Sequence, residues 1–354
     1  DEIACALKEQ FGFEVESIKA LGGYEDFNYY TREASSQREL LLKIRTICTP
    51  AIKCDIVGFI TESPTSDVMR KAMVHLRSHG VPAPKPIKNR NGKYYGCYKF
   101  DDPVGKRFLE LYTFVPGKTV VDTSWTPKSM EEMAANVGQL CAKVTLALQT
   151  FMCELDIPKG IFNPQNFLFF QKYEKFVEDK VTAGIIKECF RMFDENFPIA
   201  KKNLRKGFIH CDLSTANIIL GEDEKLWVID FELICRSYIV FELSICVAYI
   251  MVTAVQYHGD PILMAQIAIR SYEQLLPLNT TERSFLSIAI SARLATSYLS
   301  ANYQATIQPQ NVEYLFAQAG KCPKLLHVLH KRRINQKRKL VAFYMQTYLD
   351  LENK

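Results

Sequence analysis

The stretch GFIHCDLSTANIILGEDEKLWVIDFE, Gly207 to Glu232, decides the fold of this chain and carries its chemistry. It contains three short apolar runs, at residues 207–209, 217–220 and 226–229. The turn Gly221-Glu222-Asp223 separates the second run from the third, so these two runs are predicted to form a β-hairpin. The polar loop 210–217 would then lie beside the end of the last strand, where Asp230 follows.

Three oxygen-bearing side chains are predicted to converge in this arrangement. Phosphoryl transfer requires a carboxylate that orients the attacking hydroxyl and accepts its proton, together with oxygen ligands for Mg²⁺. We therefore predict Asp212 as the base that meets the substrate hydroxyl, and Asn217 and Asp230 as metal ligands. His210 is predicted to structure the loop by hydrogen-bonding to backbone groups. Asp and Asn are also ordinary turn formers, so the prediction depends on their joint spacing, which matches that of protein kinases in looser form.

Length and composition indicate a two-lobed soluble protein. The 354 residues are 48% hydrophobic and 23% charged, with a formal net charge of +5. This charge favours anionic ligands slightly but requires no nucleic-acid partner, and no obligate protein partner or membrane association is expected. The eleven cysteines are an odd number without a C-x-x-C pair. They are expected to be reduced, buried thiols of a cytoplasmic protein.

The N-terminal part of the chain is predicted to form an antiparallel sheet. A helix at residues 3–11 precedes strands at 15–21, 24–32 and 39–44. Gly22 and Gly23 join the first two strands. Glycines at such a turn let backbone amides approach phosphates, but a plain hairpin explains them equally well.

Lys43 is a second candidate for phosphate binding. It interrupts the apolar strand Leu-Leu-Lys-Ile, and a buried cation is costly unless an anion pairs with it. The α- and β-phosphates of a nucleotide and a carboxylate from the next helix are suitable anions. Asp67, at the start of the predicted helix 67–79, is the expected carboxylate, or Glu62 if that helix begins earlier. The alternative is an edge-strand lysine that points to water.

The boundary between the lobes is predicted at Pro116-Gly117. Two more strands, at residues 94–100 and 108–115, precede this break. The domains are therefore an N-terminal nucleotide-binding lobe, residues 1–116, and a C-terminal catalytic and substrate lobe, residues 117–354. Nucleotide bases commonly bind in a crevice between lobes, so backbone groups near Tyr112, Phe114 and Val115 are the candidates for base recognition.

The C-terminal lobe is predicted to be mainly helical. Its helices are expected at residues 129–151, 180–193, 239–255, 260–276, 282–301, 311–319 and 325–349. The apolar segment 239–255 is short and contains Glu242, so a buried core helix is favoured over a membrane span. Glu242 and Arg293 are charges within apolar helices and are candidates for binding the amine and the carboxylate of an amino acid. They could equally form one structural ion pair.

At this point the motifs resemble a known family. HCDLSTAN followed by VIDFE is similar to the motifs of the aminoglycoside phosphotransferase and choline kinase superfamily, whose fold is like that of protein kinases. KALGGYEDFNYY, LYTFVPG and YIVFELSICVAYIM resemble its hydroxylysine kinase branch over nearly the whole chain. The resemblance implies an α+β, protein-kinase-like fold of two lobes. It also implies Asp212 as base, Lys43 on the phosphates, Mg²⁺ on Asn217 and Asp230, GTP (or ATP) as donor, and 5-hydroxy-L-lysine as acceptor.

Several residues depart from the family pattern. The usual HGDLN is HCDLS here, which places Cys211 and Ser214 next to the base and can narrow the room for substrate. Asp230-Phe231 is followed by Glu232-Leu233 where close relatives carry Gly-Asp. A second acid would favour an amine-bearing substrate, so Leu233 leaves the acceptor open. The alternatives are a kinase of another amino alcohol, choline-like or aminoglycoside-like, and a pseudokinase that binds nucleotide.

Overall fold

The computed structural model describes residues 2–21, 27–46, 64–102, 105–154 and 160–335. The described chain divides into two compact units. Unit 1 comprises Asp1–Thr123, Lys143–Ile161 and Gly207–Arg236, and unit 2 comprises the remaining segments. Unit 1 thus holds the whole predicted N-terminal lobe together with the central stretch quoted above. The lobe boundary after residue 116 stays a prediction.

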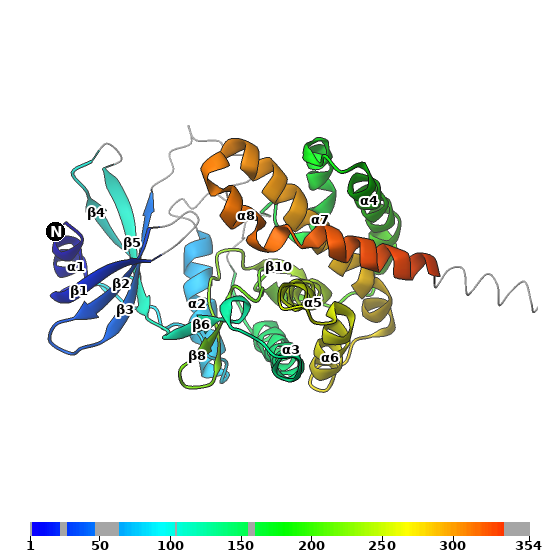
Figure 1. The fold of residues 1–354 in the computed structure, drawn as a ribbon. Coiled ribbons are helices and arrows are strands. Elements are labelled where there is room, and N and C mark those ends of the chain that lie inside the picture. The colour runs from blue at the N-terminus through cyan, green and yellow to red at the C-terminus, as the bar shows by residue number, and fades with distance from the viewer. Residues whose placement is uncertain (1, 22–26, 47–63, 103–104, 155–159, 336–354) are drawn as a thin grey trace, which may run out of the picture. The chain divides into compact units, whose positions relative to one another are not determined.

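A five-stranded antiparallel sheet forms the first part of unit 1 (Figure 1). Its strand order is β1-β2-β3-β5-β4. The elements of this part are α1 (Glu2–Phe11), β1 (Val15–Leu21), β2 (Phe27–Glu33), β3 (Glu39–Thr46), α2 (Pro64–Ser78), β4 (Gly96–Lys99) and β5 (Lys106–Thr113). The predicted antiparallel N-terminal sheet is confirmed.

The alternation of side chains along β3 separates a core face from a polar face. Leu40, Leu42 and Ile44 are buried against α1 and β5 in one apolar cluster. Successive side chains of a strand point to opposite faces, so Lys43 and Arg45 lie together on the other face. The apolar cluster therefore holds in place the strand that carries both cations.

A three-stranded sheet carries the central stretch. Its strand order is β6-β8-β9, with β6 at Gly117–Thr119, β8 at Ile218–Gly221 and β9 at Leu226–Val228. The predicted hairpin is therefore present as β8 and β9. Gly117 lies so close to β8 that a Cβ atom there would be 2.3 Å from the carbonyl oxygen of Leu220. Only glycine fits at this contact. In the chain, β7 (Lys206–Ile209) precedes the hairpin and β10 (Cys235–Tyr238) follows it. A 3₁₀ helix, η1, spans Val120–Asp122.

The rest of the chain is mostly helical. Its elements are α3 (Pro127–Gln149), which contributes to both units, η2 (Pro164–Phe176), α4 (Lys180–Ala200), α5 (Ile239–Gln256), α6 (Pro261–Glu273), α7 (Thr280–Ile307), η3 (Pro309–Asn311) and α8 (Val312–Ala319), and residues 322–335 are also helical. A sheet-containing N-terminal part and a helical C-terminal part confirm the predicted α+β class.

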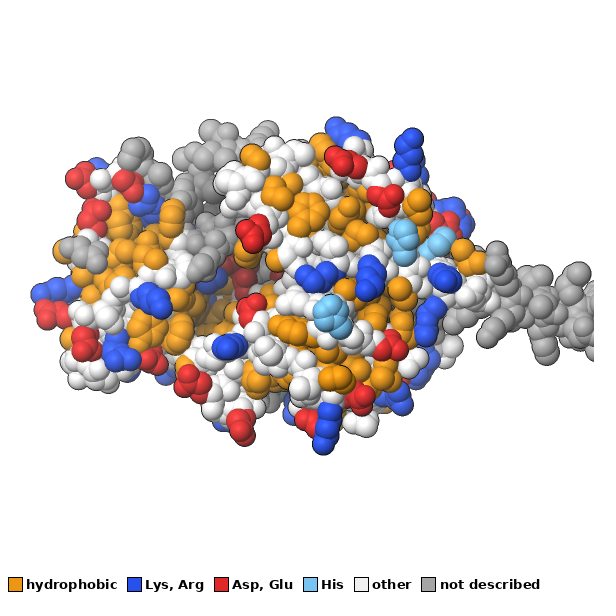
Figure 2. Space-filling view, viewed as in Figure 1, with side chains coloured by type: hydrophobic (Ala, Val, Ile, Leu, Met, Phe, Trp, Pro, Cys, Tyr) orange, Lys and Arg blue, Asp and Glu red, His pale blue; other side chains and the backbone are white. Residues whose placement is uncertain are grey.

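Helix α5 forms the core of unit 2, where it packs against α6 and α7. By length and composition it is apolar enough to cross a membrane, but 83% of it is buried inside the structure. This degree of burial is that of a core helix, as predicted. The cysteines that the structure describes are free thiols, and most of them are buried. On the face drawn in Figure 2, acidic and basic side chains are interspersed with apolar ones.

Candidate active site

The register of the β8–β9 hairpin places the two predicted metal ligands near each other. Ile218 pairs with Val228, and one residue further out the N–H of Ile229 donates to the carbonyl of Asn217 at 3.0 Å. Asp230 is the next residue after Ile229. Asp230 therefore lies one residue beyond the position opposite Asn217, at the open end of the hairpin.

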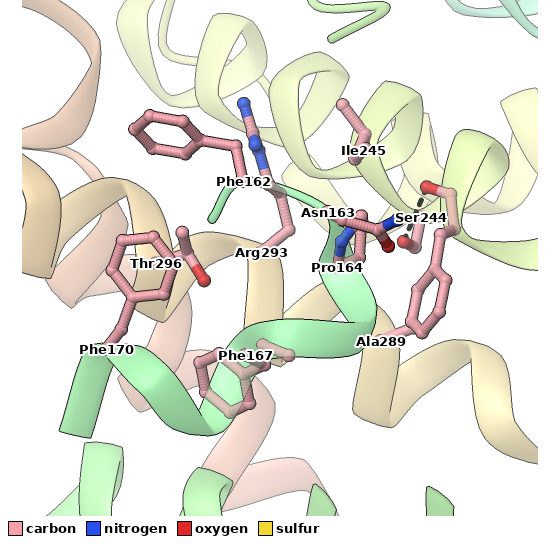
Figure 3. A pocket seen from close by; sticks show the side chains of 12 residues that line it. Phe162, Asn163, Pro164, Phe167, Phe170, Ser244, Ile245, Ala289, Arg293 and Thr296 are labelled. Carbon is pink, nitrogen blue, oxygen red and sulfur yellow. Dashed lines mark hydrogen bonds between the residues drawn. The ribbon is translucent and has the colours of Figure 1, made fainter. Parts of the chain in front are cut away.

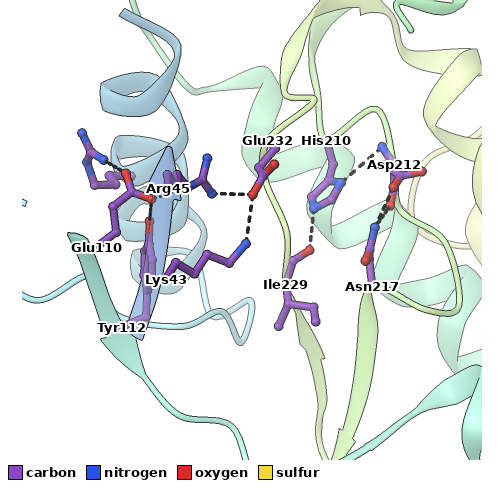
Figure 4. A network of polar contacts seen from close by, with 10 residues as sticks. Lys43, Arg45, Glu110, Tyr112, His210, Asp212, Asn217, Ile229 and Glu232 are labelled. Atoms are coloured by element: carbon purple, nitrogen blue, oxygen red, sulfur yellow. Dashed lines mark hydrogen bonds and ion pairs between the residues drawn. The ribbon is translucent and has the colours of Figure 1, made fainter. Parts of the chain in front are cut away.

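The loop before β8 brings Asp212 to the same place. The Asn217 side chain donates through Nδ2 to the carbonyl oxygen of Asp212 at 2.9 Å and to its Oδ2 at 2.7 Å (Figure 4). The Ser214 N–H donates to the Asp212 carbonyl at 2.7 Å, which tightens the loop. Asp212 remains partly exposed, so a substrate hydroxyl can reach its carboxylate.

His210 bridges the loop and the end of β9. Its Nε2 donates to the carbonyl of Ile229 at 3.0 Å, and its Nδ1 accepts from the N–H of Asp212 at 3.3 Å. Both bonds require the neutral tautomer with its proton on Nε2. The side chain is fully buried, and this burial lowers its pKa from 6.5 to about 4, although the Asp212 charge and the Ile229 carbonyl act to raise it. The structure thus places this ring between backbone groups of the loop and the strand.

The depressed pKa of His210 predicts a pH dependence of stability. Between pH 6.5 and about 4 the unfolded chain binds a proton on this residue that the folded chain does not. The contribution of His210 to the free energy of unfolding should therefore fall by roughly 3 kcal/mol as the pH drops through this window and be constant above it, whereas the raised pKa of Asp230 acts in the opposite direction in both the wild type and the His210 variant. Urea unfolding from pH 4 to 7.5 measures the effect. His210→Gln should have a flatter profile than the wild type.

The matched control for this measurement is His79→Gln, which removes an exposed imidazole at the end of α2. This variant should keep the profile of the wild type. Equal slopes for His210→Gln and the wild type would contradict the assignment of the acid sensitivity to His210.

Cys211, next to the base, has a left-handed backbone with φ of 69°. A non-glycine residue in this region is strained by about 1 kcal/mol or more. The position therefore suits the glycine of the family motif, and this chain tolerates the strain there. The Cys211 side chain is buried at 1% exposure, so it packs into the interior next to the loop.

Asp230 has the features of a cation ligand. Its Oδ1 is buried and makes no hydrogen bond within the described part of the chain, although the residue as a whole is partly exposed. Burial, with the nearby charges of Glu232 and Asp212, raises its pKa to about 6, while Lys43 and Arg45 act to lower it. A buried carboxylate oxygen without a donor is suited to a hard cation such as Mg²⁺. The φ of 60° at Asp230 is a second strained position in this site.

The ligand set at this site is small. Among the residues that the structure describes, no three His, Cys, Asp or Glu side chains are grouped to hold a metal ion. Asn217 adds a side-chain amide. Its nitrogen donates to Asp212, and its oxygen therefore points the opposite way. Asp230 and Asn217 would thus supply two oxygens, and a site of this type is completed by water and substrate phosphates.

Lys43 and Arg45 reach this site from β3. Lys43 Nζ donates to Glu232 Oε1 at 2.9 Å, and Arg45 Nη2 donates to the same oxygen (Figure 4). Asp67, the predicted partner of Lys43, instead pairs with Lys71 at 2.7 Å. The prediction for Asp67 is wrong because a half-exposed acid on α2 pairs locally with the lysine one turn away. Gly22, Gly23 and Glu62 lie outside the described residues.

Glu110 of β5 is a buried carboxylate beside Lys43 and Arg45. In the sheet register it lies opposite Lys43. Its carboxylate is 3.1 Å from Arg45 Nε, pairs with Arg70 of α2, and accepts a hydrogen bond from the Tyr112 hydroxyl at 3.1 Å. Burial and the Glu110 charge raise the pKa of Tyr112 well above its ordinary value. Sequence reasoning missed Arg45, Arg70, Glu110 and Glu232. Arg45 had a readable signal, since it lies two residues after Lys43.

The segment predicted to recognise the base is partly engaged in the sheet. Tyr112 pairs with Leu41, and its side chain is buried in the Glu110 cluster. The N–H of Phe114 donates to the carbonyl of Glu39 at 3.0 Å. Val115 follows, and its backbone groups make no hydrogen bond within the described part of the chain. The backbone of Val115 is thus better placed than the other two to meet a base.

The two predicted acceptor-binding residues belong to unit 2. Glu242 is fully buried on α5. Arg293 of α7 lines a pocket with Phe162, Phe167, Phe170 and Ile245, as Figure 3 shows. Arg293 Nη2 donates to the Tyr249 hydroxyl at 3.2 Å, and its guanidinium lies 5.2 Å from the centre of that ring. A guanidinium in an apolar pocket is suited to bind a carboxylate.

The chain is similar to known phosphotransferases along most of its length. A model of the phosphotransferase enzyme family matches residues 17–275. A hydroxylysine kinase from Xenopus laevis is 26% identical over 352 residues, which cover 93% of this chain and 89% of that protein.

Two solved structures share the fold. A microcompartment-associated aminopropanol kinase has a TM-score of 0.66 at 13% identity, over 92% of this chain and 96% of that one. An amicoumacin kinase in complex with AMP-PNP and Ca²⁺ has a TM-score of 0.62 at 14% identity, over 91% and 92% of the chains. Since identities this low show the fold alone, these structures support the predicted kinase-like fold and not a shared substrate.

Proposed function

The chain belongs to the phosphotransferase enzyme family, and from this premise we propose that it transfers the terminal phosphate of GTP or ATP to the side-chain hydroxyl of 5-hydroxy-L-lysine. The protein is a small-molecule kinase that uses a nucleotide donor and acts on an alcohol group. Similarity to a hydroxylysine kinase along 93% of the chain supports the choice of acceptor. The free thiols support a cytoplasmic location.

One observation carries the mechanism: the Asn217 amide donates to Asp212 while the backbone of Asn217 is bonded to Ile229, the neighbour of Asp230. In the proposed reaction Asp212 orients the acceptor hydroxyl and takes its proton as the oxygen attacks the terminal phosphorus, while the bond from that phosphorus to the bridging oxygen breaks and the nucleoside diphosphate leaves. The hydrogen bond from Asn217 fixes the carboxylate, and His210 fixes the loop. Little rearrangement is then needed before proton transfer.

The nucleotide is assigned to residues of unit 1. Asn217 and Asp230 would hold Mg²⁺, which when bound neutralises charge on the phosphates. Lys43 is assigned to the phosphates, and the backbone of Val115 to the base. Arg293, in the pocket of unit 2, is assigned to the acceptor carboxylate. Glu242 does not line this pocket and is fully buried, so it is a candidate for the acceptor amine only if substrate binding uncovers it.

An acceptor panel tests the proposal. Purified protein with Mg²⁺ and either GTP or ATP is incubated with 5-hydroxy-L-lysine, lysine, homoserine, 1-amino-2-propanol or choline, and phosphorylated products are detected by mass spectrometry. We expect transfer to 5-hydroxy-L-lysine and none to lysine, which lacks the hydroxyl. Transfer to another amino alcohol but not to 5-hydroxy-L-lysine would overturn the choice of acceptor. Nucleotide binding without transfer to any acceptor would favour the pseudokinase.

The panel also tests the role of Arg293 if it includes 1,5-diaminopentan-2-ol, which is 5-hydroxylysine without its carboxylate. A charge-assisted hydrogen bond contributes about 1.5–3 kcal/mol. Arg293→Met should therefore raise the KM for 5-hydroxy-L-lysine about tenfold to a hundredfold and leave the KM for the diamine unchanged. An equal change for both acceptors would remove Arg293 from carboxylate recognition.

A further inference from the structure

Glu232 holds two cations of the candidate nucleotide site at once. Its Oε1 accepts from Lys43 Nζ at 2.9 Å and from Arg45 Nη2, and all three side chains are largely shielded from solvent, with 22%, 16% and 4% exposure respectively. Lys43 and Arg45 project from the same face of β3, and Glu232 comes from the turn after β9 (Figure 4). One carboxylate oxygen therefore lies where both cations converge.

The anchoring of Arg45 explains why this position suits an arginine. Its Nε is 3.1 Å from Glu110, while its Nη2 reaches Glu232. The rigid guanidinium fork thus has one edge fixed to the sheet and the other edge presented to an exchangeable anion. A lysine has a single ammonium group and cannot provide two separate edges.

The charge balance makes Glu232 the exchangeable partner. Glu110 is one carboxylate shared by two guanidinium groups, those of Arg45 and Arg70. It is nearly fully buried and bonded on both oxygens, whereas Glu232 is the most exposed member of the cluster. Shielded cations need an anion nearby. An incoming anion that binds Lys43 and Arg45 must therefore take the place of Glu232.

We propose that Glu232 occupies the phosphate position on Lys43 and Arg45 in the nucleotide-free protein and acts as an internal competitor of the nucleotide, and that Arg45 is a second phosphate-binding cation. The proposal rests on the proposed function, in which Lys43 contacts the phosphates. On nucleotide binding the polyphosphate replaces the carboxylate, and the Glu232 side chain leaves the two cations. The ligand class is any compact polyphosphate, with or without a nucleoside.

Polyphosphate affinity in the absence of divalent cations tests this competition. Isothermal titration calorimetry in EDTA gives the dissociation constants of GTP, ATP and inorganic tripolyphosphate for the wild type and for Glu232→Gln. Loss of the competing charge should tighten binding of all three ligands about tenfold or more, because charge-assisted pairs to the two cations no longer have to be exchanged. Unchanged or weaker binding of tripolyphosphate to Glu232→Gln would overturn the proposal.

Two further variants separate competition from general effects. Glu222→Gln removes an exposed carboxylate from the β8–β9 turn with the same change of charge, and it should bind tripolyphosphate like the wild type. Equal tightening by Glu222→Gln would overturn the proposal in favour of a non-specific effect of net charge. Glu232→Asp keeps the charge but shortens its reach, and should tighten binding less than Glu232→Gln. Circular dichroism and thermal unfolding establish that each variant is folded.

If the wild type phosphorylates its acceptor but Glu232→Gln binds tripolyphosphate no more tightly, only the competition is wrong. If Glu232→Gln binds tripolyphosphate more tightly but the wild type transfers no phosphate to any acceptor, the anion site stands and the proposed function fails.

Discussion

Replacing Asp212 with Asn should lower kcat by about a hundredfold or more while leaving nucleotide affinity close to that of the wild type. A positioned general base contributes about 10²–10⁴-fold to rate. The amide of Asn has the same shape as the carboxylate and can still accept the hydrogen bond that Asn217 donates at 2.7 Å, but it cannot take the proton of the acceptor hydroxyl. The loss should therefore appear in kcat at saturating acceptor, and calorimetry should show retained nucleotide binding.

The control for this variant is Asp223→Asn in the exposed β8–β9 turn, which makes the same chemical change in the same hairpin. It should keep kcat within about twofold of the wild type, since surface substitutions are usually near neutral. A less than tenfold loss in Asp212→Asn would mean that the reaction does not need this base, and the mechanism would have to rely on charge stabilisation and positioning alone.

The convergence of Asp212, Asn217 and Asp230 followed from local rules that can be read in the sequence. The turn between two apolar runs predicted the hairpin, and the register of a hairpin fixes which residues meet at its open end. The bond between Ile229 and Asn217 is the direct result. The local sequence pattern therefore predicted the part of the site that the β8–β9 hairpin and the loop before it form.

The cation cluster depends on long-range contacts that no local pattern encodes. Lys43 and Glu232 are 189 residues apart. The expected partner, Asp67, follows from its place at the start of the predicted helix 67–79, but in the structure it pairs with Lys71. Glu110 lies within the predicted strand 108–115, and only the β3–β5 register places it opposite Lys43.

The elements that sequence reasoning missed have irregular local signals. Residues 164–176 form the 3₁₀ helix η2, which contains a kink at Asn166 and many aromatic residues without a 3.6-residue period. α4 continues to Ala200 although Pro198 lies in its last turn and removes one backbone hydrogen bond there. Where the period was clear, as in β1 and α5, the predicted and observed ranges nearly coincide.

Replacing Glu110 with Gln should have the largest effect on stability, a loss of about 3–5 kcal/mol in the free energy of unfolding. Glu110 is 3% exposed and is the shared counter-charge of Arg45 and Arg70. Removing one partner of a buried ion pair leaves an uncompensated charge in a medium of low polarity, which is far more costly than losing a surface pair. Urea unfolding at pH 7, followed by fluorescence and circular dichroism, measures the change.

Glu39→Gln on β3 of the same sheet is the matched control for Glu110→Gln. Glu39 also pairs with an arginine, Arg32, but the two side chains are 37% and 41% exposed, so its loss should cost less than about 1 kcal/mol. The double variant Arg70→Met/Glu110→Met should recover part of the stability lost in Glu110→Gln, because it removes one of the two guanidinium groups that would otherwise lack a counter-charge. If Glu110→Gln cost no more than Glu39→Gln, Glu232 alone would suffice to balance the cations, and the cluster would not depend on Glu110.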